Sequence, residues 1–271
     1  MTPPPFFARI AFLGLGAIGR SVLAGLQSSI GPGGGIAVLV RPASRARYAD
    51  IAGIELFTDV EALKKWKPHL AVECAGHAVV AEVAPGLLRA GIDVMIASVG
   101  ALADEGLRHA LDTAARAGHA SLLTVTGAIG GLDALDAARG AGLTSVSYIG
   151  RKPPHAWAGT PAAQACDLAN ITEPTVVFEG TAADSARLYP KNANVTAAAA
   201  LAGVGFEKTR VRMIADPGID KNVHELEVEG DFGRFFIRLE NNALPGNPRT
   251  SWLAALSIEA ELRKYLALAA R

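Results

Sequence analysis

The order of apolar and polar positions changes in character about halfway along the chain. In the first half, short apolar runs alternate with helical patterns, which is typical of a parallel β-sheet whose strands are connected by helices. The run Ile36–Val40 has no polar interruption, as expected of a strand that is buried on both faces. The expected strands are 9–13, 36–40, 69–74, 93–98 and 121–126, and helices are expected to about residue 27, over 79–90 and over 104–117.

Beyond residue 127 the segments become longer and alternate with a period of two. Residues 230–233 (GDFG) separate the last two of these segments and predict a hairpin. This pattern predicts a second domain with a mostly antiparallel or mixed sheet and helices on one side. The segments are 144–150, 175–180, 209–215, 223–229 and 234–240.

The C-terminal residues predict an amphipathic helix that completes the first domain. Ala255, Ile258, Leu262, Tyr265 and Ala269 fall at spacings of three and four, so they line one helix face. We expect this helix to pack back on the first half of the chain.

A glycine-rich turn joins the first expected strand to the first expected helix. In its sequence, GLGAIG, Gly14 allows a tight turn, Gly16 lets the backbone approach a pyrophosphate, and Gly19 permits close packing of helix on strand. The free N–H groups where Ala17 and Ile18 open the helix favour phosphate charge. The motif predicts a Rossmann dinucleotide-binding domain; the alternative is a glycine-rich turn without a ligand.

The end of the second expected strand bears on the choice of dinucleotide. Rossmann domains that bind NAD usually carry an acidic residue here, which hydrogen-bonds the ribose 2′-hydroxyl. This chain instead has Arg41, with Ser44 and Arg45 close behind, and arginine matches the oxygens of a 2′-phosphate. We therefore expect NADP to be accepted alongside NAD. The alternative is that these arginines are solvated surface charges.

His224 is the candidate for acid–base chemistry. With Leu226 and Val228 it shares one face of the expected strand 223–229, and three glutamates occupy the other face. The histidine is therefore expected to face inward, where an imidazole can exchange protons with an amine or a water near neutral pH. The alternative is a core histidine satisfied by a backbone carbonyl.

Composition narrows the classes of protein that fit. Lys and Arg together number 26, as do Asp and Glu, so net charge suggests neither a nucleic-acid nor a membrane partner. Cys74 and Cys166 form no CxxC pair, and no metal site is expected. No basic leader precedes an apolar run, and no apolar run reaches roughly 20 residues. These features predict a soluble cytoplasmic protein with a small-molecule substrate.

Four further blocks, together with the glycine turn, make the chain similar to the L-aspartate dehydrogenase family over nearly its whole length. Each block falls in the domain where the family has it, and the set is far more specific than the glycine turn alone. The blocks are ASVGAL (97–102), TGAIGGLD (126–133), PKNANV (190–195) and DKNVHE (220–225).

The resemblance implies a chemistry and roles for individual residues. Family members oxidise L-aspartate with NAD or NADP, reversibly, to iminosuccinate, which hydrolyses to oxaloacetate and ammonia and links the family to pyridine nucleotide biosynthesis. By this resemblance His224 is the catalytic acid–base residue, while Ala128, through its backbone amide, and Asn194 bind the cofactor. The sheet of the second domain is expected to build a homodimer.

Together these inferences predict an α/β protein with two domains. A Rossmann domain covers 1–127 with the terminal helix 248–271, and an α+β substrate, catalytic and dimerisation domain covers 128–247. Two substrate carboxylates require cationic or amide donors, for which Lys191 comes first and Arg187 second, although either is also explained as a surface charge.

Two other functions remain open on the sequence. One is another two-domain reductase built on the dihydrodipicolinate-reductase-like plan, which has a similar glycine turn and returning helix. The other is a non-catalytic sensor that binds NADP and keeps the fold. Substrate profiling distinguishes the two enzymes, because only one should turn over aspartate, and tight cofactor binding without turnover would indicate the sensor.

Overall fold

The computed structural model describes residues 8–26 and 34–269, which fall into two compact units. The first unit comprises residues up to Val125 together with those from Ala255 onward. The second is the continuous segment Thr126–Ala254.

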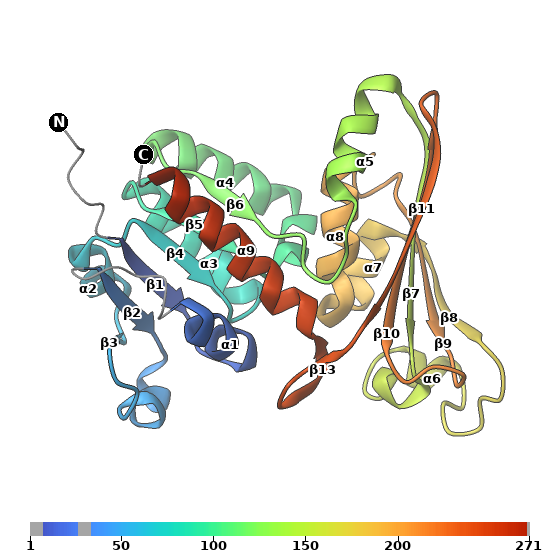
Figure 1. Cartoon of the computed structure of the whole chain (residues 1–271), viewed down its shortest axis with the longest axis horizontal. Helices are drawn as coiled ribbons and strands as arrows, with labels where there is room; N and C mark the ends of the chain where they lie inside the picture. The colour runs from blue at the N-terminus through green and yellow to red at the C-terminus, as the bar shows by residue number, and fades with distance from the viewer. Residues whose placement is uncertain (1–7, 27–33, 270–271) are drawn as a thin grey trace. The chain divides into compact units, whose positions relative to one another are not determined.

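A six-stranded parallel sheet forms the centre of the first unit, with the strand order β3-β2-β1-β4-β5-β6 (Figure 1). Chain order reverses between β1 and β4, and ligands of such sheets bind beyond the carboxyl ends of the strands at this point. The strands are β1 (Arg9–Leu13), β2 (Gly35–Leu39), β3 (Glu55–Phe57), β4 (Leu70–Glu73), β5 (Asp93–Ile96) and β6 (Leu122–Thr124).

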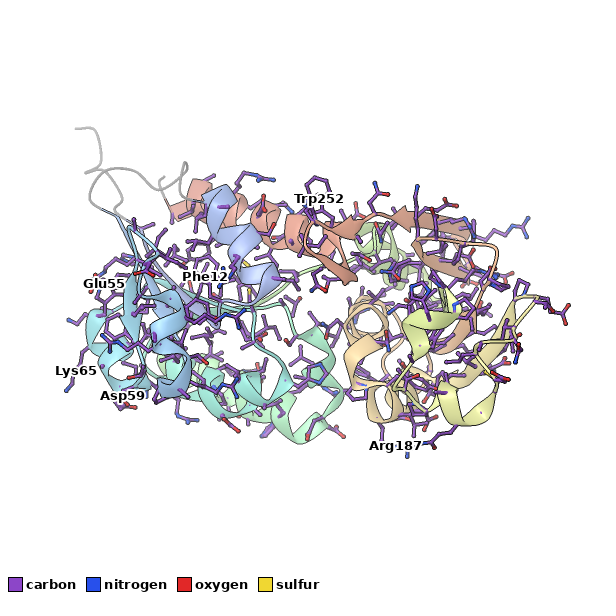
Figure 2. All side chains as sticks on the ribbon, turned by 90° about the horizontal axis from the view of Figure 1, so that it is seen from below. Phe12, Glu55, Asp59, Lys65, Arg187 and Trp252 are labelled. Atoms are coloured by element: carbon purple, nitrogen blue, oxygen red, sulfur yellow. The ribbon has the colours of Figure 1, made fainter. Side chains whose placement is uncertain are left out.

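Helices cover both faces of this sheet. In Figure 2, α1 and α9 lie on one side of it and α3 and α4 on the other. A Cβ on Gly118 of α4 would stand 1.8 Å from the carbonyl oxygen of Leu88 in α3, so these two helices meet through their backbones. The elements are α1 (Ala17–Leu26), η1 (Pro42–Tyr48), α2 (Val60–Trp66), α3 (His77–Arg89), η2 (Val99–Ala103), α4 (Glu105–Gly118) and α9 (Trp252–Ala269).

Helix α9 begins in the second unit and returns the chain to the first. Its buried side chains include Ala255, Ile258 and Leu262, which the periodicity of the sequence placed on one face. Tyr265 fastens it to the sheet, because its hydroxyl donates to Oδ2 of Asp93 over 2.8 Å.

The second unit contains a mixed five-stranded sheet in the order β11-β10-β7-β9-β8. Neighbouring strands are antiparallel except β7 and β9, which run parallel. The hairpin expected at 230–233 joins β10 to β11. The strands are β7 (Leu143–Lys152), β8 (Thr175–Thr181), β9 (Arg210–Ala215), β10 (Asn222–Gly230) and β11 (Gly233–Asn241), with a two-stranded sheet of β12 (Ala243–Leu244) and β13 (Asn247–Ser251).

The helices of the second unit leave one face of this sheet uncovered. Helices α5, α7 and α8 lie against the other face (Figure 1). The uncovered surface, here called the open face, carries Ser145, Ser147, Glu227, Arg234 and Phe236, and the Phe236 side chain is 56% exposed. The elements are α5 (Leu132–Ala138), η3 (Arg139–Ala141), η4 (Pro154–Trp157), α6 (Ala162–Ala165), α7 (Ala182–Leu188), η5 (Pro190–Asn192) and α8 (Ala193–Ala202).

No helix in the described part of the chain has both the length and the apolar character needed to cross a membrane.

Candidate active site

A pocket of about 700 Å³ lies in the first unit beyond the carboxyl ends of β1, β2 and β4. This is the switch point of the sheet, where a dinucleotide is expected. The lining residues come from the glycine turn, the end of β2, the start of η1, and the loop and helix that follow β4. Among them are Gly14, Gly16, Arg41, Ser44, Tyr48, Cys74, Ala75 and Glu82.

The glycine turn has the geometry of a phosphate cradle. Gly14 has a φ of +82°, and a Cβ there would lie 2.7 Å from the Cβ of Ala75. A Cβ on Gly16 would meet nothing within 4 Å, so the backbone at this residue borders open space. Ala17 and Ile18 open helix α1, and Gly19 lies close enough to the turn that a Cβ would stand 3.1 Å from the carbonyl oxygen of Gly14. The turn therefore fits the pyrophosphate of a dinucleotide.

A buried carboxylate holds the loop that faces this turn. Glu73 ends β4, is fully buried, and accepts hydrogen bonds from the backbone N–H groups of Ala75 and Gly76, both at 2.6 Å. The N–H and the hydroxyl of Ser98 donate to the same carboxylate, each over 3.0 Å. Glu73 thus sets the position of Ala75 against Gly14. Glu73 is not among the residues predicted from the sequence, although a lone acid that ends an apolar strand is a usable signal.

The end of β2 offers cationic rather than acidic groups to the pocket. Arg41 and Ser44 line it, and Arg41 is exposed. Arg45, the other candidate, is not among the lining residues. The one carboxylate that the described lining contains is Glu82, which belongs to α3 instead of the end of β2. The pocket is therefore compatible with a ribose 2′-phosphate as well as with a 2′-hydroxyl.

In the second unit, His224 lies on β10, on the face of the sheet that the helices cover. Its Nδ1 is 2.7 Å from the hydroxyl oxygen of Tyr148 on β7, and the side chain is 5% exposed. Among the described residues, Nε2 of His224 has no hydrogen-bond partner. Tyr148 therefore contacts one ring nitrogen, and the other has no partner among the described residues.

Gly150 makes this contact possible. In the strand register Gly150 pairs directly with His224. A Cβ at Gly150 would lie 2.8 Å from the hydroxyl oxygen of Tyr148, so a larger residue would displace that hydroxyl from the imidazole. The missing side chain leaves room for the tyrosine ring to reach across to the histidine.

The buried groups around His224 have shifted proton affinities. Burial, and secondly the charge of Lys152, lower the pKa of His224 to about 3, so the imidazole is neutral at physiological pH. Burial also lowers the pKa of Lys152 to about 8. Burial, and secondly the charge of Glu225, raise the pKa of Tyr148. The site therefore has a neutral base beside a single cation.

Lys152 ends β7 on the same face as Tyr148 and Gly150. Its ammonium group donates to Oδ1 of Asn192 and lies 5.4 Å from the centre of the Trp157 ring. Sequence reasoning missed Lys152 because the expected strand ended at residue 150, and it missed Tyr148 because a single strand does not reveal its cross-strand partners.

Ala128 and Asn194 lie in the second unit, as His224 does. The carbonyl oxygen of Ala128 accepts from Nδ2 of Asn241 over 2.8 Å, and Asn241 pairs with Asn222 at the start of β10. Asn194 is the second residue of α8, which follows directly on Asn192, the partner of Lys152. Both residues are thus linked to the end of the sheet that holds His224.

The two residues expected to bind substrate, Lys191 and Arg187, belong to the segment 182–192 of the second unit. Arg187, labelled in Figure 2, is exposed and pairs with Asp184 of the same helix over 3.1 Å. Lys191 belongs to η5, but its side chain lies outside the described residues. The local ion pair of Arg187 does not support a role in substrate binding.

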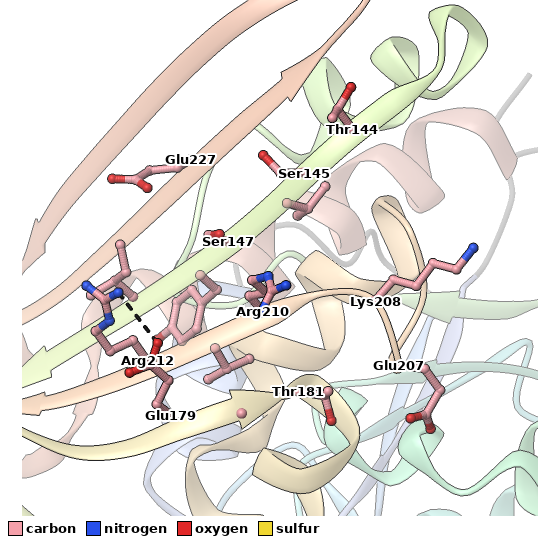
Figure 3. A pocket seen from close by; sticks show the side chains of 15 residues that line it. Thr144, Ser145, Ser147, Glu179, Thr181, Glu207, Lys208, Arg210, Arg212 and Glu227 are labelled. Atoms are coloured by element: carbon pink, nitrogen blue, oxygen red, sulfur yellow. Dashed lines mark ion pairs between the residues drawn. The ribbon is translucent and has the colours of Figure 1, made fainter.

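A separate cavity of about 630 Å³ lies on the second unit (Figure 3); Tyr148 is among its lining residues, whereas His224 and Lys152 are not. It is lined by residues of β7, β8 and β9 and by the loop before β9, and includes Ser147 and Glu227 of the open face. Arg212 and Glu179 form an ion pair of 3.6 Å there. This polar hollow belongs to the surface of the sheet, on the face opposite His224.

Two models of known protein families match the two parts of the chain. Residues 133–265 match the model of the aspartate dehydrogenase C-terminal domain. Residues 14–124 match that of the homoserine dehydrogenase NAD-binding domain.

Individual relatives extend the match to nearly the whole chain. The chain is 45% identical to an L-aspartate dehydrogenase of Ralstonia nicotianae, over 92% of this chain and 94% of the relative. It is 46% identical to that of Ruegeria pomeroyi, over 94% and 92%. A crystal structure of aspartate dehydrogenase from Thermotoga maritima aligns with a TM-score of 0.77 and 27% identity, covering 96% of this chain and 97% of that one.

The family models confirm the expected nucleotide-binding and aspartate dehydrogenase parts, and the solved structure confirms the α/β fold with a parallel sheet and a second, mixed sheet. With relatives of this identity covering more than nine-tenths of its length, the chain belongs to the L-aspartate dehydrogenase family.

Proposed function

We propose that this protein catalyses the reversible, NAD- or NADP-dependent oxidative deamination of L-aspartate to iminosuccinate, which water converts to oxaloacetate and ammonia. The observation that carries the proposal is the buried, neutral His224, whose Nε2 has no partner among the described residues, in a chain of this family. Such a group is suited to take a proton from a substrate.

The cofactor's place follows from the glycine turn. Gly14, Gly16 and Gly19, with the opening of α1 at Ala17 and Ile18, hold the pyrophosphate, and Arg41 binds a 2′-phosphate when NADP is used. From the family resemblance, Ala128 and Asn194 supply further contacts to the cofactor. When bound, the nicotinamide supplies the acceptor for the hydride that leaves Cα of aspartate.

His224 accepts the protons that the reaction removes from the substrate amine and from water. The substrate amine must lose a proton before its carbon can give up a hydride, and Nε2 of a neutral imidazole can accept it. Once Nε2 has released this proton to solvent, it can accept another from the water that attacks the imine carbon. Because water is the only further reactant, the products are oxaloacetate and ammonia.

A second copy of the chain is the proposed partner. The helices cover only the opposite face of the sheet. The open face is therefore exposed, and it presents Phe236 beside charged residues of the same strand. An uncovered sheet face with an exposed aromatic side chain suits a two-fold contact with an identical face.

The test is formation of reduced nicotinamide, followed by absorbance at alkaline pH, with L-aspartate and with NAD and NADP separately. D-aspartate, L-glutamate and L-alanine are the substrate controls. We expect turnover of L-aspartate that falls on the order of 10²–10⁴-fold in His224→Ala, because the proton acceptor is lost. The variant His109→Ala, at an exposed position on α4, should retain full activity.

Activity with NADP would support the role of Arg41. If folded protein binds the cofactor but turns over no L-aspartate, the proposal fails and a sensor or a reductase of another substrate replaces it. If His224→Ala keeps full activity, aspartate chemistry remains but the proton acceptor is another group.

A further inference from the structure

We propose that Lys152 is the cation that receives a carboxylate of the substrate beside His224. This inference rests on the proposed function, since it assigns a binding group to the same site. Arg187 is exposed and pairs with Asp184 of its own helix, so it is not the group that we assign to this role.

The strand register puts the two groups next to each other. Gly150 is the direct partner of His224, and Lys152 is two residues farther along β7, so its side chain lies on the same face as the imidazole. Diagonal neighbours of this kind stand about 7–8 Å apart, within reach of a long side chain. The charge of Lys152 acts on the proton affinity of His224, which is consistent with this proximity.

The charge of Lys152 is not neutralised by a carboxylate. Among the described residues it forms no ion pair, although its neighbour Arg151, on the opposite face, pairs with Glu225 at 3.3 Å and Asp216 at 3.5 Å. Lys152 is half-buried, and a cation partly removed from water without a counter-ion is costly, so an anionic ligand relieves that cost. The chain thus pairs the arginine internally and leaves the lysine for another anion.

The protein also holds this ammonium in a set direction. Oδ1 of Asn192 occupies one of its three donor positions, and the Trp157 ring lies beside it. Trp157 is itself fixed, since it is buried and its Nε1 donates to the carbonyl oxygen of Ile214 over 3.2 Å. A preoriented cation loses less freedom on binding, so it favours an anion with a defined position.

The first test measures the binding of succinate, a dicarboxylate without the reacting amine, by calorimetry with saturating NADPH present. We expect Lys152→Met to raise the dissociation constant for succinate on the order of 10–100-fold, because a charge-assisted hydrogen bond is lost. The dissociation constant for NADPH should stay unchanged. The matched control is Lys208→Met, at an exposed lysine of the same unit.

A charge-conserving variant keeps the test decisive if methionine disturbs the fold. The pKa of Lys152 is about 8, so succinate binding to the native protein should weaken as the pH rises from 7 to 9. The pKa of His224 is about 3 and that of Tyr148 is raised, so neither facing group changes charge in this range. Lys152→Arg should bind succinate with no such pH dependence.

The outcomes separate this inference from the proposed function. If Lys152→Met turned over aspartate at the native rate and with an unchanged KM, the role of Lys152 would be overturned and the proposed function would stand. Succinate binding that depends on Lys152 in a protein without aspartate turnover would support the carboxylate site and count against the function. Failure of the native protein to bind succinate would overturn the inference.

Discussion

At the scale of single residues, the bond between Tyr148 and His224 determines how the imidazole can react. A hydroxyl can donate or accept, so it serves either tautomer of the neutral ring. When Nε2 takes a proton, Nδ1 must carry its own, and this N–H then donates to the tyrosine oxygen 2.7 Å away. In the proposed mechanism, the tyrosine therefore stabilises the imidazolium that forms when Nε2 accepts a proton.

Replacing this hydroxyl tests the contact. Tyr148→Phe should lower kcat on the order of 10-fold, because one hydrogen bond to a charged group is worth roughly 1.5–3 kcal/mol. The pH profile of kcat should shift, and the nitrogen chemical shifts of His224 should report a changed tautomer ratio, with the KM for the cofactor unaltered.

A matched control separates this role from simple packing. Tyr189 is also buried, and its hydroxyl donates to the carbonyl oxygen of Val177 over 3.1 Å without touching a histidine. If Tyr189→Phe and Tyr148→Phe changed the pH profile equally, the positioning role of Tyr148 would be lost.

The sequence predicted the candidate residues unevenly. Alternation along one strand was enough to place His224 on the face shared with Leu226 and Val228, which the structure confirms. It was not enough to find Tyr148 or Lys152, because their proximity depends on which strand pairs with which, and in what register. Such pairing is a property of the tertiary fold.

At the scale of elements, the strands with a clear apolar or alternating pattern were the easiest to predict. β1 has the predicted bounds, and the hairpin of β10 and β11 lies where the glycines placed it. β3 has three residues, too few for a period to show. Helix α8 was not predicted because its own side chains are mostly alanine and are apolar on nearly all sides. Its sequence therefore has no polar face to contrast with a buried one.

The open face of the second unit leads to a prediction about assembly. Phe236→Glu should convert the proposed dimer to monomers, because it replaces the exposed aromatic side chain of the open face with a charge that the contact would bury. Sedimentation velocity across a range of protein concentrations measures this. Leu188→Glu, at an exposed apolar residue outside the sheet, is the control. A Phe236→Glu variant that sediments as the native dimer would place the contact elsewhere.

At the scale of the whole molecule, His224 links stability to pH. The folded protein keeps this histidine neutral down to a pH of about 3, whereas an unfolded chain protonates it near its ordinary pKa of about 6.5. Below that value the unfolded state binds the extra proton, so stability falls as the pH falls and is unaffected above about 7.5.

Urea unfolding at two pH values checks the size of this effect. Between pH 7.5 and 5.5, the native protein should lose about 1.4 kcal/mol more than His224→Gln, which has no group to protonate. Equal losses in the two proteins would mean that His224 titrates normally in the folded state.

Helix α9 has a consequence for how the protein is made. Its Tyr265 contacts Asp93, and Glu259 lies against Gly25 of α1, yet α9 is synthesised after every other described element. The continuous second unit has nearly all its residues before α9 appears, whereas the first unit still lacks α9 at that stage. Domains fold as their residues become available. The segment made first is therefore completed last, and the nascent chain carries a nucleotide-binding sheet that still lacks α9 when the strand that holds His224 has already been made.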